Sequence, residues 1–409
     1  RLLSITTQQS EQEQTPNRNP AGLPAELAYQ EGSLNLSPIQ SSGSPEGDVE
    51  IVVNHNEEVD KKSVQHFIAF FNNRYKALRS ILQTRQELSN ITSIGRLRNR
   101  EQKSSIAFIG MIMEKVVTKN NNIILTIEDP TGMTKVLVNN NKQNIFNTAN
   151  ECVLDEVVGI AGVTGDGIVF ANALILPDVP ITKELKKSPD EVYAVFLSDV
   201  HVGSNKFLGK EFNKFLRWIR GEAGSEAQRE VARKVKYIFV VGDLVDGVGI
   251  YPGQEKELSI PDIYNQYSEF ARLIKLIPQD KKIIIGPANH DAVRLAEPQP
   301  KLYENFAKPL YEMENVKLVS NPAYVKIHHT QGFPGFDVLM YHGYSFDYFV
   351  ANIDSIRVAG GYDRIDLLMK FLLQRRHLAP THTSSLYVPD SEKDPLVIDR
   401  VPDIFVTGH

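Results

Sequence analysis

Five short apolar runs in the second half of the chain each end in polar residues that can bind a metal ion. The runs are "YAVFLSDVHVG", "YIFVVGDLVDG", "KIIIGPANHDA", "VLMYHGYSFD" and "DIFVTGH". Apolar runs of this length are typical of buried strands, and helical stretches lie between them at 210–220, 262–277 and 301–312. Because open α/β sheets bind ligands at the carboxyl ends of their strands, the pattern predicts an α/β sandwich with its site at those ends.

The residues after these runs form a set that suits two divalent metal ions. Asp199 and His201 are two apart, so on an extended chain their side chains point to the same side. The remaining candidates are Asp243, Asn289, His290, His342 and His409. Asp, His and Asn ligands without cysteine suit Mn, Fe or Zn, with Mn expected here. Two ions about 3.5–4 Å apart can hold the attacking and the leaving oxygens of a phosphoester, and Asp243 is the natural bridging carboxylate.

Each cluster taken alone also has a structural explanation. "SDVH" is commonly a strand-to-helix cap, and the histidine of "YHG" is commonly a hydrogen-bonded structural residue. Five clusters in order, each behind an apolar run, favour metal binding. The other nearby histidines are expected to be structural: His328 and His329 on a surface face, His377 and His382 beside a loop. Asp246 is expected in a turn or behind a ligand.

Residues 105–182 have the period-two alternation of strands, separated by turn signals such as "NNN" and "DPTG". A short polar segment, "NKQNIFNTAN", follows the third run. Five strands with a short helix after the third predict an OB barrel. Such barrels bind single nucleic-acid strands or other proteins. The runs carry few arginines and few aromatic residues, Phe108 and Phe170 among them, so we favour protein docking over strand binding.

The first 104 residues divide into a tail and a helical segment. Residues 1–56 are rich in Gln, Ser, Pro, Asn and Glu, which is typical of a disordered tail or linker. Within 57–104, apolar residues recur at helical spacing over 63–88 and predict an amphipathic helix. Basic residues run from Arg74 to Lys103. They allow two interpretations: a solvated helix face followed by a basic linker, or contacts to a nucleic-acid backbone.

Composition excludes several classes of protein. The net charge of -5 over 409 residues gives no sign that the molecule as a whole binds nucleic acid. Cys152 is the single cysteine, which excludes a disulfide framework and fits a reducing, cytoplasmic location. No run of about 18 apolar residues indicates a membrane span. The chain begins at Arg1, without an initiator Met, so we expect its natural start to lie elsewhere.

The motif order D-x-H, G-D-x-x-D, G-N-H-D/E, H-G and G-H-x-H resembles that of the calcineurin-like metallophosphoesterases over residues 190–409. The resemblance implies an α+β multidomain chain in which the OB barrel precedes a four-layer α/β/β/α domain. It also implies that Asp199 and His201 bind one metal ion and Asp243 bridges. Asn289, His342 and His409 would bind the second ion.

The same resemblance implies a catalytic role for His290, which would contact the scissile phosphate or protonate the leaving oxygen. Asp291 would orient its imidazole. A second histidine of the last motif would stand two residues beyond His409, so we expect the natural protein to continue there. Ala288 departs from the pattern, which has glycine at this position, and a positive φ would be unfavourable for alanine.

The type of phosphoesterase is indicated by two further features. The stretch "GDLVDGVG" lacks the arginine of the protein Ser/Thr phosphatases. A barrel ahead of the phosphoesterase domain, with "ANHDAVRLAEPQP" and "YHGYSFD", resembles the small subunits of archaeal family-D DNA polymerases. That resemblance implies a 3′–5′ proofreading exonuclease acting on DNA with a single-stranded or mismatched 3′ end. Its expected partner is a large catalytic polymerase subunit, and a sliding clamp is a further candidate.

Two alternatives from other classes stay open on the sequence. One is a non-catalytic scaffold subunit of a polymerase, which the intact ligand positions disfavour. The other is a stand-alone hydrolase of small phosphodiesters, which the barrel and the long leader disfavour.

Overall fold

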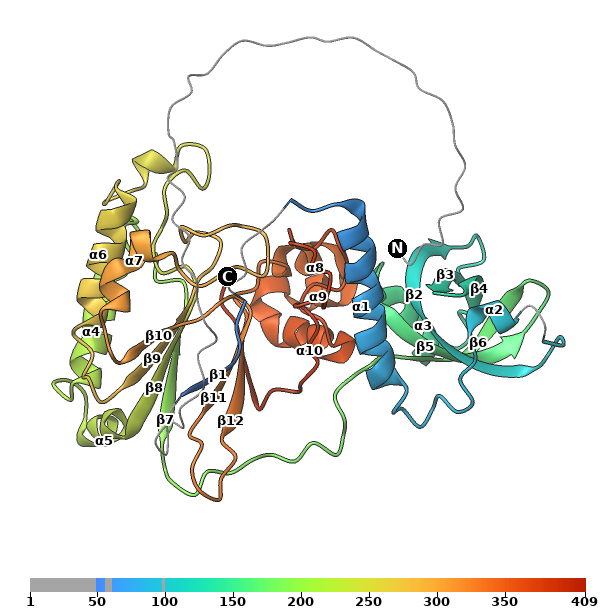
Figure 1. The fold of residues 1–409 in the computed structure, drawn as a ribbon, viewed down its shortest axis with the longest axis horizontal. Helices are drawn as coiled ribbons and strands as arrows, with labels where there is room; N and C mark the ends of the chain where they lie inside the picture. The colour runs from blue at the N-terminus through green and yellow to red at the C-terminus, as the bar shows by residue number, and fades with distance from the viewer. Residues whose placement is uncertain (1–48, 56–60, 98–99) are drawn as a thin grey trace, which may run out of the picture.

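The computed structural model describes residues 49–55, 61–97 and 100–409. Figure 1 shows a β-barrel at one end, a layered α/β unit at the other, and the long helix α1 (Val64–Leu82) between them. In the part of the chain that is described, no helix is long and apolar enough to cross a membrane.

The barrel closes through five strands in the order β2-β3-β4-β6-β5, with helix α3 (Gln143–Glu151) after the third strand. The strands are β2 (Ser105–Val117), β3 (Ile123–Asp129), β4 (Gly132–Val138), β5 (Val157–Thr164) and β6 (Ile168–Ile175). Alternate residues of β3, namely Ile123, Leu125 and Ile127, are fully buried in the interior, as the two-residue period of a strand requires. The predicted five strands and their helix are confirmed.

Helix α1 packs against the outside of the barrel. Its buried Phe70, Tyr75 and Leu78 form one apolar cluster with Ile109 and Met111 of β2. The helix ends at Leu82, before the predicted limit of 88, and a one-turn helix α2 (Ile94–Leu97) follows it. The apolar residues that recur at helical spacing therefore attach the helix to the barrel.

Arg74 of α1 does not belong to a solvated face, nor is it free to contact nucleic acid. Its side chain is 1% exposed, and Nε donates to Asp394 Oδ2 at 2.6 Å. Its Nη1 donates to the carbonyl of Pro380 at 2.6 Å. His377 Nε2 lies 2.9 Å from the same oxygen of Asp394, which confirms the structural role predicted for His377. Helix α1, which carries several basic residues, is thus attached to the α/β unit by a buried ion pair.

The α/β unit has four layers. Two four-stranded sheets, β10-β9-β8-β7 and β1-β11-β12-β13, stack face to face. Phe239 and Ile284 of the first sheet meet Val325 and Val338 of the second in a shared apolar cluster. Helices α4, α6 and α7 cover the outer face of the first sheet, and α8, α9 and α10 cover that of the second (Figure 1). This is the predicted α/β/β/α order.

The elements of the α/β unit have the following bounds. The strands are β1 (Glu50–Val53), β7 (Tyr193–Leu197), β8 (Val235–Val241), β9 (Lys282–Gly286), β10 (Val316–Leu318), β11 (Ala323–Ile327), β12 (Phe336–Met340) and β13 (Ile404–Val406). The helices are α4 (Gly209–Ile219), α5 (Glu226–Lys234), α6 (Ile263–Ile274), α7 (Glu304–Tyr311), α8 (Phe346–Asn352), α9 (Asp354–Ala359) and α10 (Ile365–Arg375), with short 3₁₀ turns η1 (Gln254–Lys256) and η2 (Gly361–Arg364).

Parallel pairing brings the carboxyl ends of five strands to one edge of the unit. β7, β8 and β9 are parallel neighbours, with Leu197 opposite Val240 and Val240 opposite Ile285. In the other sheet β12 and β13 are parallel, with Met340 opposite Val406. The five motif-bearing runs are these five strands, so the sheets deliver all five polar clusters to one place.

Strand β1 corrects the expectation that residues 1–56 form a disordered tail. Residues 1–48 and 56 lie outside the described residues, but Glu50–Val53 pairs antiparallel with β11, with Ile51 opposite Val325. Val49 is only 3% exposed and packs between the two sheets. The polar composition of the segment concealed the short run "VEIVV", which gains backbone hydrogen bonds by completing the edge of a sheet.

Candidate metal centre

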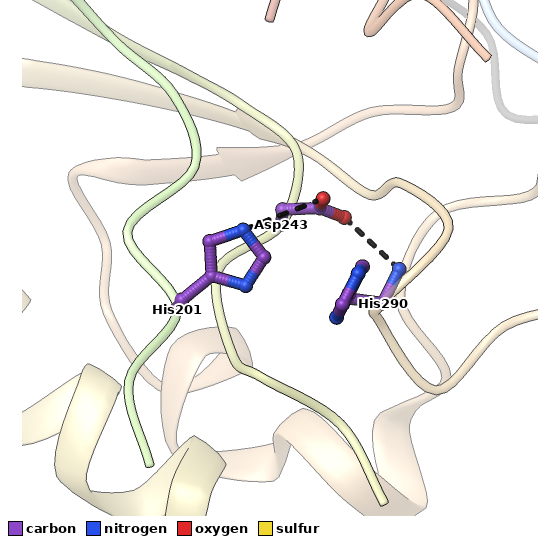
Figure 2. A group of neighbouring side chains, drawn as sticks. All are labelled: His201, Asp243 and His290. Atoms are coloured by element: carbon purple, nitrogen blue, oxygen red, sulfur yellow. Dashed lines mark hydrogen bonds and ion pairs between the residues drawn. The ribbon is translucent and has the colours of Figure 1, made fainter. Parts of the chain in front are cut away.

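The site lies where the loops after β7, β8, β9, β12 and β13 meet. His201 Nε2 is 3.7 Å from Asp243 Oδ2 and 3.9 Å from Asp199 Oδ1. His342 Nε2 is 3.3 Å from Asp243 Oδ2 and 3.9 Å from Asp199 Oδ1. Figure 2 shows the carboxylate of Asp243 between His201 and His290. Asp243 is thus central, as expected of a bridging residue.

Two groups of side chains could each hold a metal ion. One contains His201, Asp243 and His290, and the other contains Asp243, His342 and His409. In each group the potential ligand atoms lie within 4.8 Å of one another. The second group coincides with the predicted second ion, apart from Asn289. The first group includes His290, although the family resemblance implied that this residue would not bind a metal ion.

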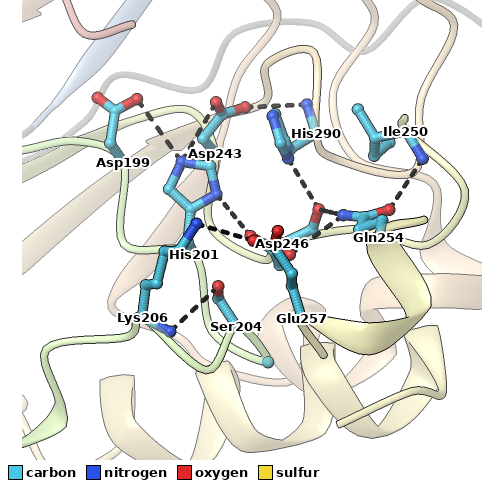
Figure 3. Close-up of polar contacts among 12 residues, drawn as sticks. Asp199, His201, Ser204, Lys206, Asp243, Asp246, Ile250, Gln254, Glu257 and His290 are labelled. Atoms are coloured by element: carbon cyan, nitrogen blue, oxygen red, sulfur yellow. Dashed lines mark hydrogen bonds and ion pairs between the residues drawn. The ribbon is translucent and has the colours of Figure 1, made fainter. Parts of the chain in front are cut away.

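Two of the candidate histidine ligands have an oxygen atom close behind the ring. His201 Nδ1 lies 3.2 Å from Asp246 Oδ1, and His342 Nδ1 lies 2.7 Å from the carbonyl oxygen of Val241. His201 Nδ1 makes no hydrogen bond to a described residue, whereas the His342 ring can donate from Nδ1 to the Val241 carbonyl and keep Nε2 toward the carboxylates. This is the arrangement by which proteins orient a metal-binding imidazole. Asp246 lies behind His201, a position that the sequence allowed for it (Figure 3).

Asn289 supplies an independent test of whether the donor set fits metal ions. Its Oδ1 is buried and has no hydrogen-bond partner among the described residues. A buried amide oxygen without a partner costs about 1–3 kcal/mol. A divalent ion accepts such an oxygen as a ligand, and with two carboxylates and imidazole nitrogens it completes a set suited to Mn, Fe or Zn. The residues present therefore fit the expected ions.

The backbone of the site is strained at its ligands. Asp199, His201 and Asp243 have φ of 54°, 51° and 50°, the left-handed region that costs of order 1–3 kcal/mol for such residues. Main-chain hydrogen bonds hold them there: the Asp199 amide donates to Gly242 and the His201 amide to Asp243, at 3.2 and 3.0 Å. Strain maintained in this way points to a functional requirement for these side-chain directions.

Ala288 does not have the positive φ that would have strained an alanine. Its side chain is buried against Gly242 instead, where a Cβ added to the glycine would lie 2.3 Å from the Ala288 Cβ. The departure from the family pattern is therefore accommodated by packing.

Charges within the site are mutually stabilising. Burial opposes ionisation of Asp243, but the neighbouring His342 and His290 outweigh burial and lower the pKa of the carboxyl. Burial likewise disfavours a charged His342, but Asp243 and then Asp199 outweigh it and raise the pKa of the imidazole to about 9. The Asp243 carboxylate therefore stays ionised and available to a cation.

Asp291 is placed differently from the expectation that it would orient the His290 imidazole. His290 Nδ1 lies 2.8 Å from the carbonyl oxygen of Asp246, so that carbonyl orients the ring. Asp291 does not contact the imidazole. It accepts hydrogen bonds from the Ala288 amide at 2.9 Å and from the Tyr267 hydroxyl at 3.2 Å. Burial first, and then the charge of Asp243, raise the pKa of Asp291 to about 7. Asp291 shapes the turn that carries Asn289 and His290.

The other histidines lie away from the centre, with one correction. His328 is 1% exposed, and its Nδ1 lies 3.4 Å from the Tyr237 hydroxyl, so it is not on a surface face. His329 is exposed, as predicted. His382 is anchored by Asp155 at 2.7 Å. Sequence reasoning missed Asn321, whose Oδ1 accepts from the His342 amide at 2.9 Å, because nothing in the motif series signals it.

The class of protein follows from comparison of this chain with known proteins. Residues 194–409 match the family model that describes the B subunits of DNA polymerases alpha and epsilon. The chain is 42% identical to the DNA polymerase II small subunit of Methanothermobacter thermautotrophicus, over 87% of this chain and 70% of that protein. The DNA polymerase II small subunit of Archaeoglobus fulgidus is 40% identical, over 85% of this chain and 67% of that protein. That of Pyrococcus abyssi is 38% identical, over 85% and 54%.

The chain belongs to the family of small subunits of archaeal family-D DNA polymerase, also named DNA polymerase II. It spans 54% to 70% of the length of these three relatives.

Proposed function

We propose that this chain carries the 3′–5′ proofreading exonuclease of a replicative DNA polymerase, in a domain of the calcineurin-like metallophosphoesterase type. The observation that carries the proposal is the convergence of His201 Nε2 and His342 Nε2 on the carboxylates of Asp243 and Asp199, with the His342 ring held through Nδ1 by the Val241 carbonyl. A scaffold has no use for strained ligands or for a buried, unpaired Asn289 oxygen.

Two divalent ions, with Mn expected and Fe or Zn as alternatives, would be held by Asp199, His201, Asp243, Asn289, His342 and His409. When bound, such ions activate water and neutralise charge on the phosphodiester. The side chains of the protein then have separate tasks. Asp243 places one carboxylate between the two halves of the site, and the left-handed backbone at Asp199 and His201 aims both side chains inward.

His290 is the residue we assign to the proton. Because Nδ1 is engaged by the Asp246 carbonyl, a neutral ring carries its proton there and leaves Nε2 bare. Protonation of Nε2 gives an imidazolium that can donate to the leaving 3′ oxygen and return to neutral. Asp243 lies beside this residue, where its Oδ1 accepts from the His290 amide at 2.9 Å.

The substrate we propose is a single-stranded or mismatched 3′ end of DNA. An end of this kind needs only a few kcal/mol of unpairing per base to leave the duplex. The chemistry acts on the phosphate, so sequence preference should be weak. The large polymerising subunit is the proposed partner, docked through the barrel and the α/β unit, and a sliding clamp is a second candidate.

The test is a nuclease assay combined with metal analysis on the complete natural subunit. Asp243→Asn should lose most bound metal and the exonuclease activity while remaining folded. His290→Ala should keep the metal and lower the rate by roughly 10²–10⁴. Asp366→Asn, which breaks only an exposed pair with Arg364, is the control. A wild-type protein that holds no metal and releases no nucleotide would be a scaffold.

A further inference from the structure

An aromatic pocket opens beside the metal centre and is not used by the chemistry described above. We define it by Phe207, Leu208, Phe212, Phe215 and Tyr251, with Asp199 and His201 forming its wall toward the centre. Its volume is about 580 Å³. Volumes of this order are typical of pockets for small organic groups. Whatever binds there lies next to the phosphate that the centre would hold.

The pocket wall presents aromatic surface to solvent. The Phe207 and Phe212 ring centroids are 6.1 Å apart, and those of Phe212 and Phe215 are 5.7 Å apart. Leu208 is 68% exposed and Tyr251 39%. Large apolar side chains grouped on one exposed surface mark a binding site more often than chance placement does.

The charges around the pocket argue against a phosphate inside it. Four acidic residues line it, Asp199, Glu211, Asp246 and Glu257, against a single cation, Lys206. That cation is paired with Glu257 at 2.8 Å. An anion would be repelled, whereas a neutral aromatic ring would gain stacking and lose little. The pocket therefore suits the base of a nucleotide and not its phosphate.

The loop that carries Phe207 is held in place. The Asn205 amide donates to the Glu257 carbonyl at 2.8 Å, and the Ser259 amide donates to Gly203 at 2.7 Å. The Lys206 amide donates to Ser204 Oγ at 3.3 Å (Figure 3). A pre-formed wall loses little entropy when a ring stacks on it.

We infer that the aromatic pocket binds, by stacking, the nucleobase of the 3′-terminal nucleotide that the centre removes. The inference rests on the proposed exonuclease function and names what selects the substrate. A base can enter the pocket only after leaving its own stack and pair. A mismatched end therefore reaches the centre more readily than a matched one. Stacking is tolerant of base identity, so the pocket discriminates by pairing state and not by sequence.

The first experiment compares two single-stranded oligonucleotides on the complete natural protein, one with an ordinary 3′-terminal nucleotide and one whose last nucleotide lacks its base. The wild type should cleave the ordinary end with a kcat/KM roughly 5- to 100-fold higher. Phe207→Ala should lower kcat/KM for the ordinary end until the difference between the two ends disappears. Tyr264→Ala, an exposed aromatic stacked on Phe306 in the outer helix layer, should change neither.

A second experiment reads the pocket without any cleavage. Trp218 is the single tryptophan of the chain, and its ring lies 6.1 Å from that of Phe215. Deoxyadenosine monophosphate should change its fluorescence, deoxyribose 5-phosphate should not, and Phe207→Ala should abolish the response. Binding without cleavage in the first assay would refute the exonuclease and leave the pocket assignment standing.

Equal cleavage of both ends by the wild type, with no fluorescence response, would overturn the pocket assignment and leave the exonuclease intact. The assignment would also fall if Phe207→Ala weakened association with the large subunit while nucleotide binding was unchanged. That result would make the pocket a protein contact.

Discussion

The guanidinium of Arg74 and the carboxylate of Asp394 form a fully buried ion pair, with Nε 2.6 Å from Oδ2. It joins α1, which packs on the barrel, to the segment that leads into β13 and the last motif histidine. Replacing Arg74 with Met leaves Asp394 buried without its cation and should lower the free energy of unfolding by about 3–5 kcal/mol. Urea unfolding followed by circular dichroism measures the change.

The control for this substitution is Arg79→Met, an exposed arginine on the same helix, which should shift stability by less than about 0.5 kcal/mol. Equal effects from the two substitutions would show that the pair contributes nothing beyond helix propensity.

His377 makes stability depend on pH. Burial, and then the charge of Arg74, lower the pKa of His377 to about 4, whereas the unfolded value is about 6.5. The unfolded chain thus takes up this proton first. The contribution of the neutral ring to the free energy of unfolding is complete above pH 6.5, and it is lost as the pH falls toward 4. Between these two pH values, His377 alone should change the free energy of unfolding by up to about 1.4 kcal/mol per pH unit.

His377→Gln should flatten that acid-side slope, and the exposed His329→Gln should not. The slope of each variant must be compared with that of the wild type, because Glu297 changes stability with pH in the opposite direction. Burial raises the pKa of Glu297 to about 7, so its contribution is lost as the pH rises from 4.5 toward 7. An unchanged slope in His377→Gln would mean that the ring titrates normally in the folded protein.

Gly242 is required by the ring of His342. Its φ is 79°, and a Cβ there would lie 2.3 Å from the Ala288 Cβ and 2.7 Å from His342 Nδ1. Gly242→Ala should displace the imidazole and reduce metal content and nuclease rate by roughly 10–100-fold. Gly249 has nearly the same φ, 77°, but open space around its Cβ position. Gly249→Ala therefore carries the same backbone strain without the clash, and equal loss in both variants would rule out the steric explanation.

Residues 49–55, which include strand β1, should contribute to stability. Deleting residues 1–55 removes the pairing with β11 and the burial of Val49, which alone contributes about 1.5–3 kcal/mol. Deleting residues 1–48, whose composition is too polar to build a core, should have little effect. Thermal unfolding distinguishes the two deletions, and identical midpoints would show that β1 is dispensable.

The sequence by itself predicted the order of the barrel and the α/β unit, and most of the residues that the structure brings together at the candidate site. Apolar alternation predicted the barrel, and apolar runs ending in polar clusters predicted the sheets and the residues at their ends. These are local patterns, because the period of a strand and the residue after it are both read along the chain.

Tertiary structure alone decided which groups face each other. That Arg74 is buried depends on Asp394, a residue 320 positions away. Likewise, a carbonyl of the Asp246 loop orients His290, whereas the adjacent Asp291 binds the backbone. Strand β1 joins a sheet whose other members lie more than 250 residues later. The partner of a charge, of a ring nitrogen or of a strand edge is fixed by packing in space, and no pattern along the chain encodes it.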